Sequence, residues 1–361
     1  MKSGYRYFLA AALGCLLAPH SFAQAGNNNP TGVTGEFNGS ITTAGHYDPF
    51  TGNAKRIIDD IVVPGSIGAY PLKWSRILNT RGVSSSFGDG GGWSHSYAWG
   101  LWVRSSNPPP LGGENQYDGP LGGVSYPDGR RLDLWSDGPP WTLTEAEGPQ
   151  GVSHKLFDRG GGNYDLLLGD GGTVRFQTVS GGLRPYVIVD PYGQTTTLEY
   201  DANGLSRVTE PGGRYLQINY TTFSYQVTLS NTTYTVYENL VSSVQAWDGR
   251  GNLLETVHYH YVREDVRAIV NVTFFNLTQA DYDDGTHGFY TYFPGGQATN
   301  SAWSTSPGRT KTCDDVRYAG PMKQIEYEYV QRGDVADHYL AWGHESTPAH
   351  GNAGRRGHPR L

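Results

Sequence analysis

The sequence has very little cysteine and no long apolar run after its first residues. Only Cys15 and Cys313 are present among 361 residues. Loss of the N-terminal segment would leave Cys313 alone, which excludes an internal disulfide, so the fold must be stabilised by strand pairing and burial. No later segment reaches the roughly 18 to 20 apolar residues that a membrane-spanning helix requires, so we expect no transmembrane segment.

Helical periodicity and positive charge are also scarce. Windows that would carry apolar residues at i, i+3, i+4 and i+7 in a helix show alternation or glycine instead. The formal net charge is −7, and it becomes −9 when Lys2 and Arg6 are removed with the N-terminal segment. A negative field opposes binding to phosphate backbones, so we expect no nucleic-acid partner.

Glycine and tyrosine, in contrast, are abundant. The chain has 50 glycines and 25 tyrosines, and the glycines stand between alternating, strand-like runs. Many short strands joined by tight turns have this composition. The sequence therefore predicts an all-β protein built as an antiparallel hairpin array.

The first 25 residues predict a secretory signal peptide. Lys2 and Arg6 precede an apolar stretch at residues 8–18, and Ala23-Gln24-Ala25 offers small residues for cleavage. We therefore expect export to the periplasm, the cell surface or the medium. Residues 26–45 are rich in Asn, Gly and Thr and predict a flexible linker.

A short sequence unit occurs twice between positions 190 and 220. Each copy has a glycine turn, a polar alternating strand and a tyrosine at its end. The residues that define the repeat are Tyr192, Gly193, Tyr200, Asp201, Gly204, Gly213 and Tyr220. In the second copy, Leu216, Ile218 and Tyr220 fall on one side of an extended chain because side chains alternate along a strand. Repetition on a period of roughly 20 residues predicts units that stack to share one core.

Looser copies of the unit occur at residues 128–134, 170–176 and 248–254. The pattern resembles the Rhs/YD-repeat family, whose unit is built around a Tyr-Asp step such as Tyr200-Asp201. Residues 48–53, 74–81 and 92–97 resemble the domain that precedes the repeats in that family, and residues 316–327 resemble a segment found among them. The resemblance implies a spiralling β-sheet shell, which in longer relatives is closed by a core segment and often encloses a toxin domain. We recognise neither of these two parts in this sequence, so we expect an open or partial shell.

The expected organisation is an N-terminal Rhs-type β domain at residues 46–106, a YD-repeat-like β-hairpin array at 107–330 and a disordered tail at 331–361. The run Asn107-Pro108-Pro109-Pro110 interrupts the strand pattern between the first two parts. One long strand is predicted at residues 93–104, because apolar and aromatic side chains alternate there with Ser, Ala and Gly.

The sequence nominates no catalytic centre, and we expect no enzymatic activity. Ser94 and His95 are adjacent, so in a strand they would point to opposite faces and could not act as nucleophile and base. A glycan-active enzyme would need two carboxylates about 5 to 10 Å apart, and no spacing suggests such a pair. Cys313 has no neighbour in the sequence that would activate it, so we interpret it as an ordinary thiol.

No metal or other cofactor is expected either. Asp281, Asp283 and Asp284 are arranged as in a calcium loop, but Tyr292 stands at the twelfth position, where that loop requires glutamate. His258 and His260 share a strand face without a third ligand at suitable spacing. We interpret these groups as an acidic turn and a solvent-facing pair.

The aromatic content leads to the functional hypotheses. Packing between stacked hairpins explains Tyr200 and Tyr220, whereas Trp135 and Trp141 flank a turn and are candidates for exposed contact with surface glycans. We expect a secreted, non-enzymatic Rhs/YD-repeat scaffold or surface interaction module whose partners are glycans or another Rhs-type chain. The alternatives are the truncated wall of a toxin-encapsulating shell and, with less support, a glycan-active enzyme.

Overall fold

The computed structural model of the chain consists of β-strands and turns. It describes residues 47–48, 53–65, 67–79, 86–103, 122–127, 131–134, 145–147, 154–229, 232–266, 272–297, 305–306, 310–319, 323–331 and 339–344. No helix occurs within these ranges. The prediction of an all-β fold is therefore confirmed.

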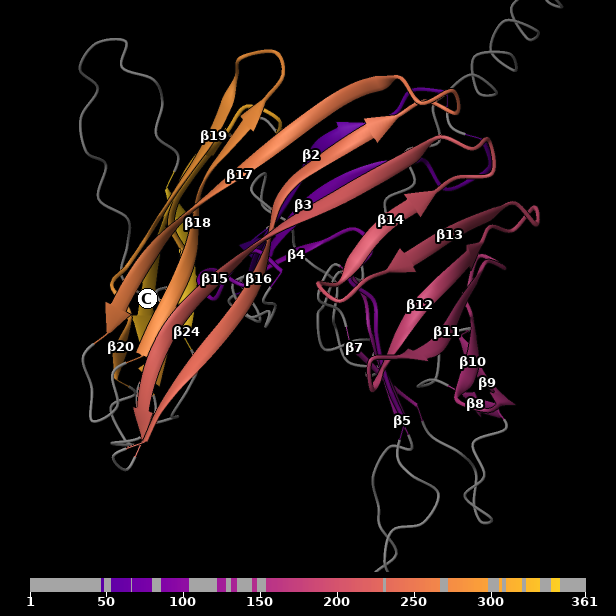
Figure 1. Ribbon diagram of the computed structural model, residues 1–361, viewed down its shortest axis with the longest axis horizontal. Coiled ribbons are helices and arrows are strands. Elements are labelled where there is room, and N and C mark those ends of the chain that lie inside the picture. Colours follow the sequence, from indigo (N-terminus) through magenta and orange to yellow (C-terminus); the bar gives the residue numbers. More distant parts are fainter. Residues whose placement is uncertain are drawn as a thin grey trace, which may run out of the picture.

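A small antiparallel sheet opens the fold, and its strands pair in chain order. They are β1 (Tyr47–Asp48), β2 (Asn53–Val62), β3 (Lys73–Asn79) and β4 (Trp93–His95). All residues of β3 from Trp74 to Asn79 are buried, so both faces of this strand are covered. We call strands β1 to β4 the inner sheet, because Figure 1 shows β2, β3 and β4 within the curve of the larger sheet.

The larger sheet is antiparallel and bends into an open arch (Figure 1). Its strands are β8 (Glu145–Glu147), β9 (Lys155–Gly160), β10 (Asn163–Leu167), β11 (Thr173–Val179), β12 (Gly182–Val189), β13 (Thr195–Tyr200), β14 (Leu205–Thr209), β15 (Tyr215–Leu229), β16 (Thr232–Trp247), β17 (Leu253–Val266), β18 (Val272–Tyr282), β19 (His287–Tyr292), β22 (Thr310–Asp315), β23 (Gln324–Gln331) and β24 (Tyr339–His344). Each pairs with the next in this order, so neighbours in sequence are neighbours in space. An open hairpin array of this kind is what the sequence predicts.

Two smaller groups of strands complete the description. Strands β5 (Gly100–Val103), β6 (Gly122–Ser125) and β7 (Arg131–Leu134) form a meander, which joins the arch where Leu101 pairs with Leu183 of β12. Among the described residues, strands β20 (Gly296–Gln297) and β21 (Thr305–Ser306) pair only with each other.

The same five-residue turn recurs along one rim of the arch. In each turn the carbonyl of the first residue accepts a hydrogen bond from the backbone N–H of the glycine three positions later. The backbone N–H of the same first residue donates to the carbonyl of the residue four positions later. The first residues of these turns are Leu168, Asp190, Glu210, Asp248 and Tyr282. The glycine has positive φ in every case, between 77° and 91°, which explains why glycine recurs there. Because the strands alternate in direction, these turns all lie on the same rim.

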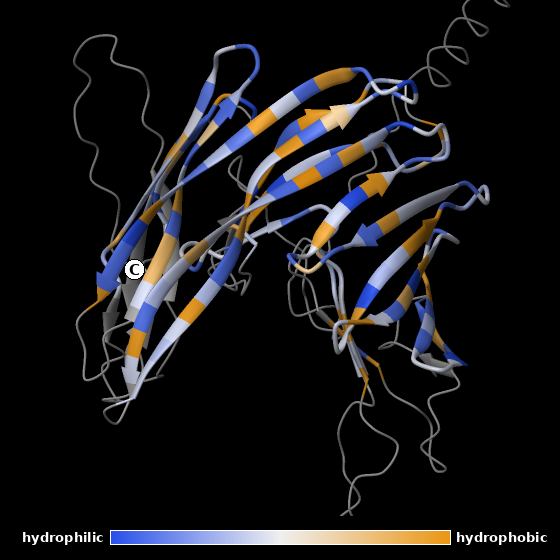
Figure 2. Ribbon diagram, in the orientation of Figure 1, coloured by the Kyte–Doolittle hydropathy of each residue, from blue (hydrophilic) through white to orange (hydrophobic). Residues whose placement is uncertain are grey.

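The arch buries the face that the sequence pattern predicts. Leu216 and Ile218 of β15 are 0% and 2% exposed, while Tyr215 on the other face stacks on Trp247 with ring centroids 6.1 Å apart. Figure 2 shows the resulting alternation of hydrophobic and hydrophilic residues along the long strands. One continuous core therefore runs along the inner side of the arch, as stacked units require.

The inner sheet covers part of that core. Phe87, in the connection after β3, meets Tyr259 of β17 edge to face with ring centroids 5.1 Å apart, and Trp93 of β4 meets Tyr290 of β19 at 4.9 Å. Isolated bridges join Ile58 to Tyr318 and Gly88 to Asn276. The arch and the inner sheet are therefore packed together across long distances in the sequence.

The structure corrects the expectation of one strand over residues 93–104. β4 ends at His95 and β5 begins at Gly100. Between them the backbone N–H of Ala98 donates to the carbonyl of His95 at 2.9 Å, and that of Trp99 donates to Tyr97. This turn moves the chain from the inner sheet to the arch, which strict alternation in the sequence does not reveal.

A second correction concerns residues 331–361, where we expected a disordered tail without strands. Residues 339–344 of this segment form β24, which pairs with β23 from Glu326 opposite His344 to Gln331 opposite Tyr339. The alternation in this segment is short and is interrupted by Gly343, so the pairing partner defines the strand more than its own pattern does.

Candidate functional site

A buried polar network joins the inner sheet to the far end of the arch. Arg76 of β3 donates to Asp60 of β2 through Nε at 2.5 Å and through Nη2 at 2.9 Å. Its Nη2 also lies 3.0 Å from Oδ2 of Asp315, at the end of β22. All three side chains are 0% exposed. One guanidinium therefore bridges two carboxylates from separate sheets.

A β-bulge brings Asp60 into this network. The register between β2 and β3 shifts between Asp59 and Ile61, so Asp60 is the extra residue. A bulge redirects a side chain relative to its strand neighbours. Asp60 is buried, while Asp59 lies at the margin and accepts hydrogen bonds from Lys73 and Ser75.

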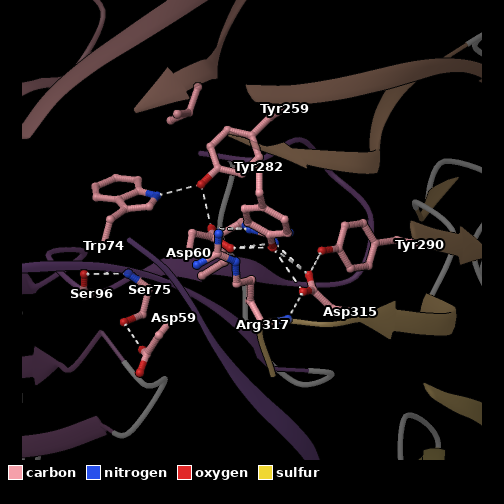
Figure 3. A network of polar contacts seen from close by, with 12 residues as sticks. Asp59, Asp60, Trp74, Ser75, Ser96, Tyr259, Tyr282, Tyr290, Asp315 and Arg317 are labelled. Carbon is pink, nitrogen blue, oxygen red and sulfur yellow. Dashed lines mark hydrogen bonds and ion pairs between the residues drawn. The ribbon is translucent and has the colours of Figure 1, made fainter. Parts of the chain in front are cut away.

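Three tyrosines of the arch donate hydrogen bonds to the two carboxylates (Figure 3). Tyr259 of β17 donates to Asp60 at 2.6 Å and accepts a hydrogen bond from the indole N–H of Trp74 at 3.0 Å. The hydroxyl of Tyr282 lies between the carboxylates, 2.9 Å from Asp60 and 3.0 Å from Asp315. Tyr290 of β19 donates to Asp315.

Burial dominates the electrostatics of the network. It raises the pKa of Asp60, and the charge and hydrogen bonds of Arg76 oppose that rise. Burial and the neighbouring Asp60 carboxylate hold the pKa of Tyr259 well above its usual value, so this phenol stays protonated and can donate. The side chains of Arg76, Asp60 and Asp315 are 0% exposed, so these charged groups offer no solvent-exposed atom to a substrate. The arrangement therefore suits a structural role, because breaking such a pair leaves an uncompensated buried charge.

A second contact lies on the rim, where the connection between β2 and β3 meets the recurring turns. We call residues 63–72 the clasp loop. Ala69 donates its backbone N–H to Asp190 at 2.6 Å, and Tyr70 donates its hydroxyl to Asp170 at 2.6 Å. Arg214 reaches back to the carbonyls of Pro64 at 2.6 Å and Gly65 at 2.8 Å. The clasp loop thus holds three successive rim turns.

The repeat-defining residues have distinct roles. Asp201 accepts hydrogen bonds from the backbones of Asn203 at 2.7 Å and Gly204 at 3.2 Å, so the Tyr-Asp step closes its own turn. Tyr200 and Tyr220 are half-buried against the core. Tyr220 also donates to the carbonyl of Leu205 at 3.0 Å. Gly204 has a φ of 141°, and a Cβ there would lie 2.8 Å from the hydroxyl of Tyr220, so both backbone strain and this contact favour glycine.

The remaining repeat-defining residues lie at the rim. Gly193 and Gly213 take φ values of 83° and 82° in their turns, with open space around each. Tyr192 is 81% exposed, so it does not pack in the core. Trp135 and Trp141, the predicted ligand contacts, lie outside the described residues.

The residues weighed for catalysis are held apart. Ser94 donates its hydroxyl to the carbonyl of Pro127 at 2.8 Å, and His95 accepts from the backbone of Tyr97 at Nδ1. Cys313 is buried, and burial is the main cause that raises the pKa of its thiol to about 12. A thiol with that pKa is a poor nucleophile at neutral pH.

The carboxylates of the acidic turn have different partners. Asp281 binds His260 at 2.6 Å and His287 at 2.7 Å, whereas Asp283 accepts from the backbone of Thr256. Within the described ranges, no group of three potential ligands is placed to hold a metal ion. The described part of the chain also has no helix that is long and apolar enough to cross a membrane.

Sequence reasoning missed the central network. Its members are scattered through six strands, and none belongs to a motif with fixed spacing. The available indication was Arg76 within an otherwise buried strand, because a charge at such a position needs a partner. Nothing in the sequence identifies Asp60 or Asp315 as that partner.

No known family model and no curated relative matches this chain. Among solved structures, the N-terminal domain of the effector protein SpvB from Salmonella typhimurium strain LT2 is 14% identical with a TM-score of 0.35, over 62% of this chain and 98% of that domain. A structure of TcdB2-TccC3-TEV is 12% identical with a TM-score of 0.40, over 82% of this chain and 19% of that chain. This chain therefore spans about a fifth of that larger protein. At these levels of similarity the comparisons carry no functional argument, and function must be argued from the residues.

Proposed function

We propose that this chain is an exported, non-enzymatic structural scaffold of the Rhs/YD-repeat type. The observation that carries the proposal is the contact of Arg76 with Asp60 and Asp315, which ties the first strands to the last third of the chain. A scaffold must keep its shape without a substrate, and a buried ion network supported by three tyrosines serves that purpose. The five rim turns and the Tyr-Asp step support the assignment to this repeat type.

The inner sheet bears on what kind of scaffold this is. Trp74, Phe87 and Trp93 fill space beneath β17 and β19 and are completely buried. This part of the arch is therefore occupied by the chain itself. We infer a self-contained wall or interaction module, with glycan contact through Trp135 and Trp141 as a separate prediction.

Expression of the full chain with its own N-terminal segment in a Gram-negative host tests the proposal. We expect a periplasmic or extracellular product whose mass shows cleavage near Ala23 or Ala25, and which elutes as one folded species without any added ligand. An unprocessed chain that stays in the cytoplasm would contradict export. An exported chain that is soluble only as an aggregate would contradict a self-contained module.

The absence of enzymatic activity is tested on the same preparation. We expect no release of reducing ends from a panel of neutral and acidic polysaccharides. Turnover that copurifies with the chain and is lost when one carboxylate is replaced by its amide, with the fold retained, would overturn the proposal in favour of a glycan-active enzyme.

A further inference from the structure

A polar cavity of about 500 Å³ lies where the turn after β4 meets the repeats. On one side are Tyr97 and Trp99 of that turn, and on the other is the Tyr-Asp step itself, from Tyr200 to Gly204. Cavities of roughly 300–1,000 Å³ accommodate small molecules. The structural scaffold described above does not need this space to be open.

Arg184 of β12 places a positive charge at this cavity. It is exposed, and within the described residues its guanidinium makes no hydrogen bond or ion pair. Two other arginines of the repeats differ in this respect, since Arg175 lies 3.8 Å from Asp165 and Arg214 is bonded to Glu210. A guanidinium without a protein partner can receive a carboxylate or phosphate in a bidentate manner.

His95 supplies a buried donor to the same cavity. Its side chain is only 6% exposed and stacks on Trp74 with ring centroids 4.6 Å apart. Burial, followed by the charge of Arg184, lowers the pKa of His95 to about 3, so the imidazole is neutral. Because Nδ1 accepts from Tyr97, the single ring proton is on Nε2. That donor has no partner among the described residues.

One acidic residue, Asp201, also lines the cavity, and its carboxylate accepts hydrogen bonds from the backbones of Asn203 and Gly204. The other polar groups that line the cavity are neutral. Ser125 and Ser180 contribute hydroxyls, and Asn203 contributes a side-chain amide. Asn239 accepts from Thr222 at 2.7 Å through its amide oxygen, which leaves its amide N–H groups available. Hydroxyls and amides of this kind bind the hydroxyl groups of a ligand, and the aromatic side chains of Tyr97 and Trp99 in the cavity lining suit its apolar surface.

We propose that this cavity binds a small polyhydroxylated anion, of the size and chemistry of a sugar acid. The ligand places its carboxylate on Arg184 and its hydroxyls on His95, Asn203 and the serines. Arg184 determines the preference for an anion, while the volume limits the ligand to about one or two rings. This site is separate from the network around Arg76, so it can fail while the scaffold assignment stands.

Titration calorimetry of the full chain with D-glucuronate, D-glucose and inorganic phosphate tests the proposal. We expect saturable binding of glucuronate with a Kd at or below about 1 mM and glucose at least about tenfold weaker, because a hydrogen bond to a charged group accounts for that ratio. Phosphate should also bind more weakly than glucuronate, since it cannot fill the cavity.

Matched variants separate recognition from folding. Arg184→Gln should remove the preference for glucuronate over glucose, whereas Arg175→Gln, an exposed arginine of the neighbouring strand, should leave it unchanged. Ala202→Trp, at an exposed position of the cavity wall, should weaken both sugars without changing the circular dichroism spectrum. No saturable binding by the folded wild-type chain would overturn the proposal. So would equal binding of glucose and glucuronate, or phosphate binding as tight as that of glucuronate, which would indicate a simple anion site.

Discussion

Arg76 and Asp315 are 239 residues apart in the sequence, and their completely buried side chains meet at 3.0 Å. The contact joins the inner sheet to the end of the arch, and Asp60 shares the same guanidinium. Loop-closure entropy opposes contacts of such separation, so the buried pairing and the aromatic packing around it must compensate. This contact is the main reason to regard the inner sheet and the arch as one structural unit.

Replacing Asp315 by Ala should destabilise the fold by about 3–5 kcal/mol, because removal of one partner from a buried ion network leaves the other charges uncompensated. Urea denaturation followed by tryptophan fluorescence measures the free energy of unfolding. The matched control is Asp314→Ala, at the neighbouring strand position, where the carboxylate accepts from Gln324 near the surface. Equal losses of unfolding free energy in the two variants would contradict the stabilising role assigned to the network.

Replacing the positive-φ glycine of a rim turn by any other residue should destabilise the fold. Gly193→Ala should lower the free energy of unfolding by about 1–2 kcal/mol, since a Cβ there meets no atom within 4 Å and strain at φ 83° is the only penalty. Gly182→Ala, in a strand with ordinary φ and no close contact, is the control and should change it by less. Gly204→Ala should cost more than Gly193→Ala because it also meets Tyr220. A neutral Gly193→Ala would show that this turn can relax.

Glu238 gives stability a dependence on pH with an unusual sign. Burial, and then the charge of Asp89, raise its pKa from 4.5 to about 7. Between these values the folded state binds the proton more tightly than the unfolded state, so the wild-type chain loses stability as pH rises from 4.5 through 7. Glu238→Gln should melt at nearly the wild-type temperature at pH 4.5 and above it at pH 8. Glu199→Gln, at an exposed position of β13, is the matched control. A difference in melting temperature that stays constant with pH would refute the assignment.

Asp281 should give the stability of the fold the opposite dependence on pH. Burial would raise its pKa, but hydrogen bonds from Gln279, His287 and His260 outweigh it and lower the pKa to about 2. Its contribution is therefore present above pH 3.8 and is lost as pH falls toward 2. Asp281→Asn should be less stable at pH 6 by less than about 1 kcal/mol, because the site is partly exposed, and the gap should narrow below pH 4. Asp133→Asn, at an exposed position of β7, is the control. A gap that widens on acidification would contradict this interpretation.

The sequence predicted those features that depend on neighbours along the chain. Alternation places Leu216 and Ile218 in the core, and the glycine pattern marks turns such as that of Gly193, because strand pleat and positive φ are local properties. The turn between His95 and Gly100 escaped prediction because the alternation continues through it in the sequence. The bulge at Asp60 escaped it because a register shift appears only when both strands are paired.

The candidate sites also separate into those that depend on neighbours along the chain and those that depend on the path of the strands. Tyr200, Asp201 and Gly204 were identified from the repeat, and the structure gives each a local role. Arg184 and His95 meet at one cavity although 89 positions separate their numbers, 95 and 184. Only the path of the strands between them brings the two together, so no sequence spacing could have indicated that cavity.

The most direct test of the central claim is limited proteolysis of the full chain followed by native mass spectrometry. If the inner sheet and the arch are one unit, fragments that contain residues 53–103 and residues 154–331 remain associated after the connections between them are cut. Release or digestion of residues 53–103 while the repeats persist would contradict the account, because it would show that the contacts of Arg76, Trp74 and Trp93 with the arch do not hold the two parts together.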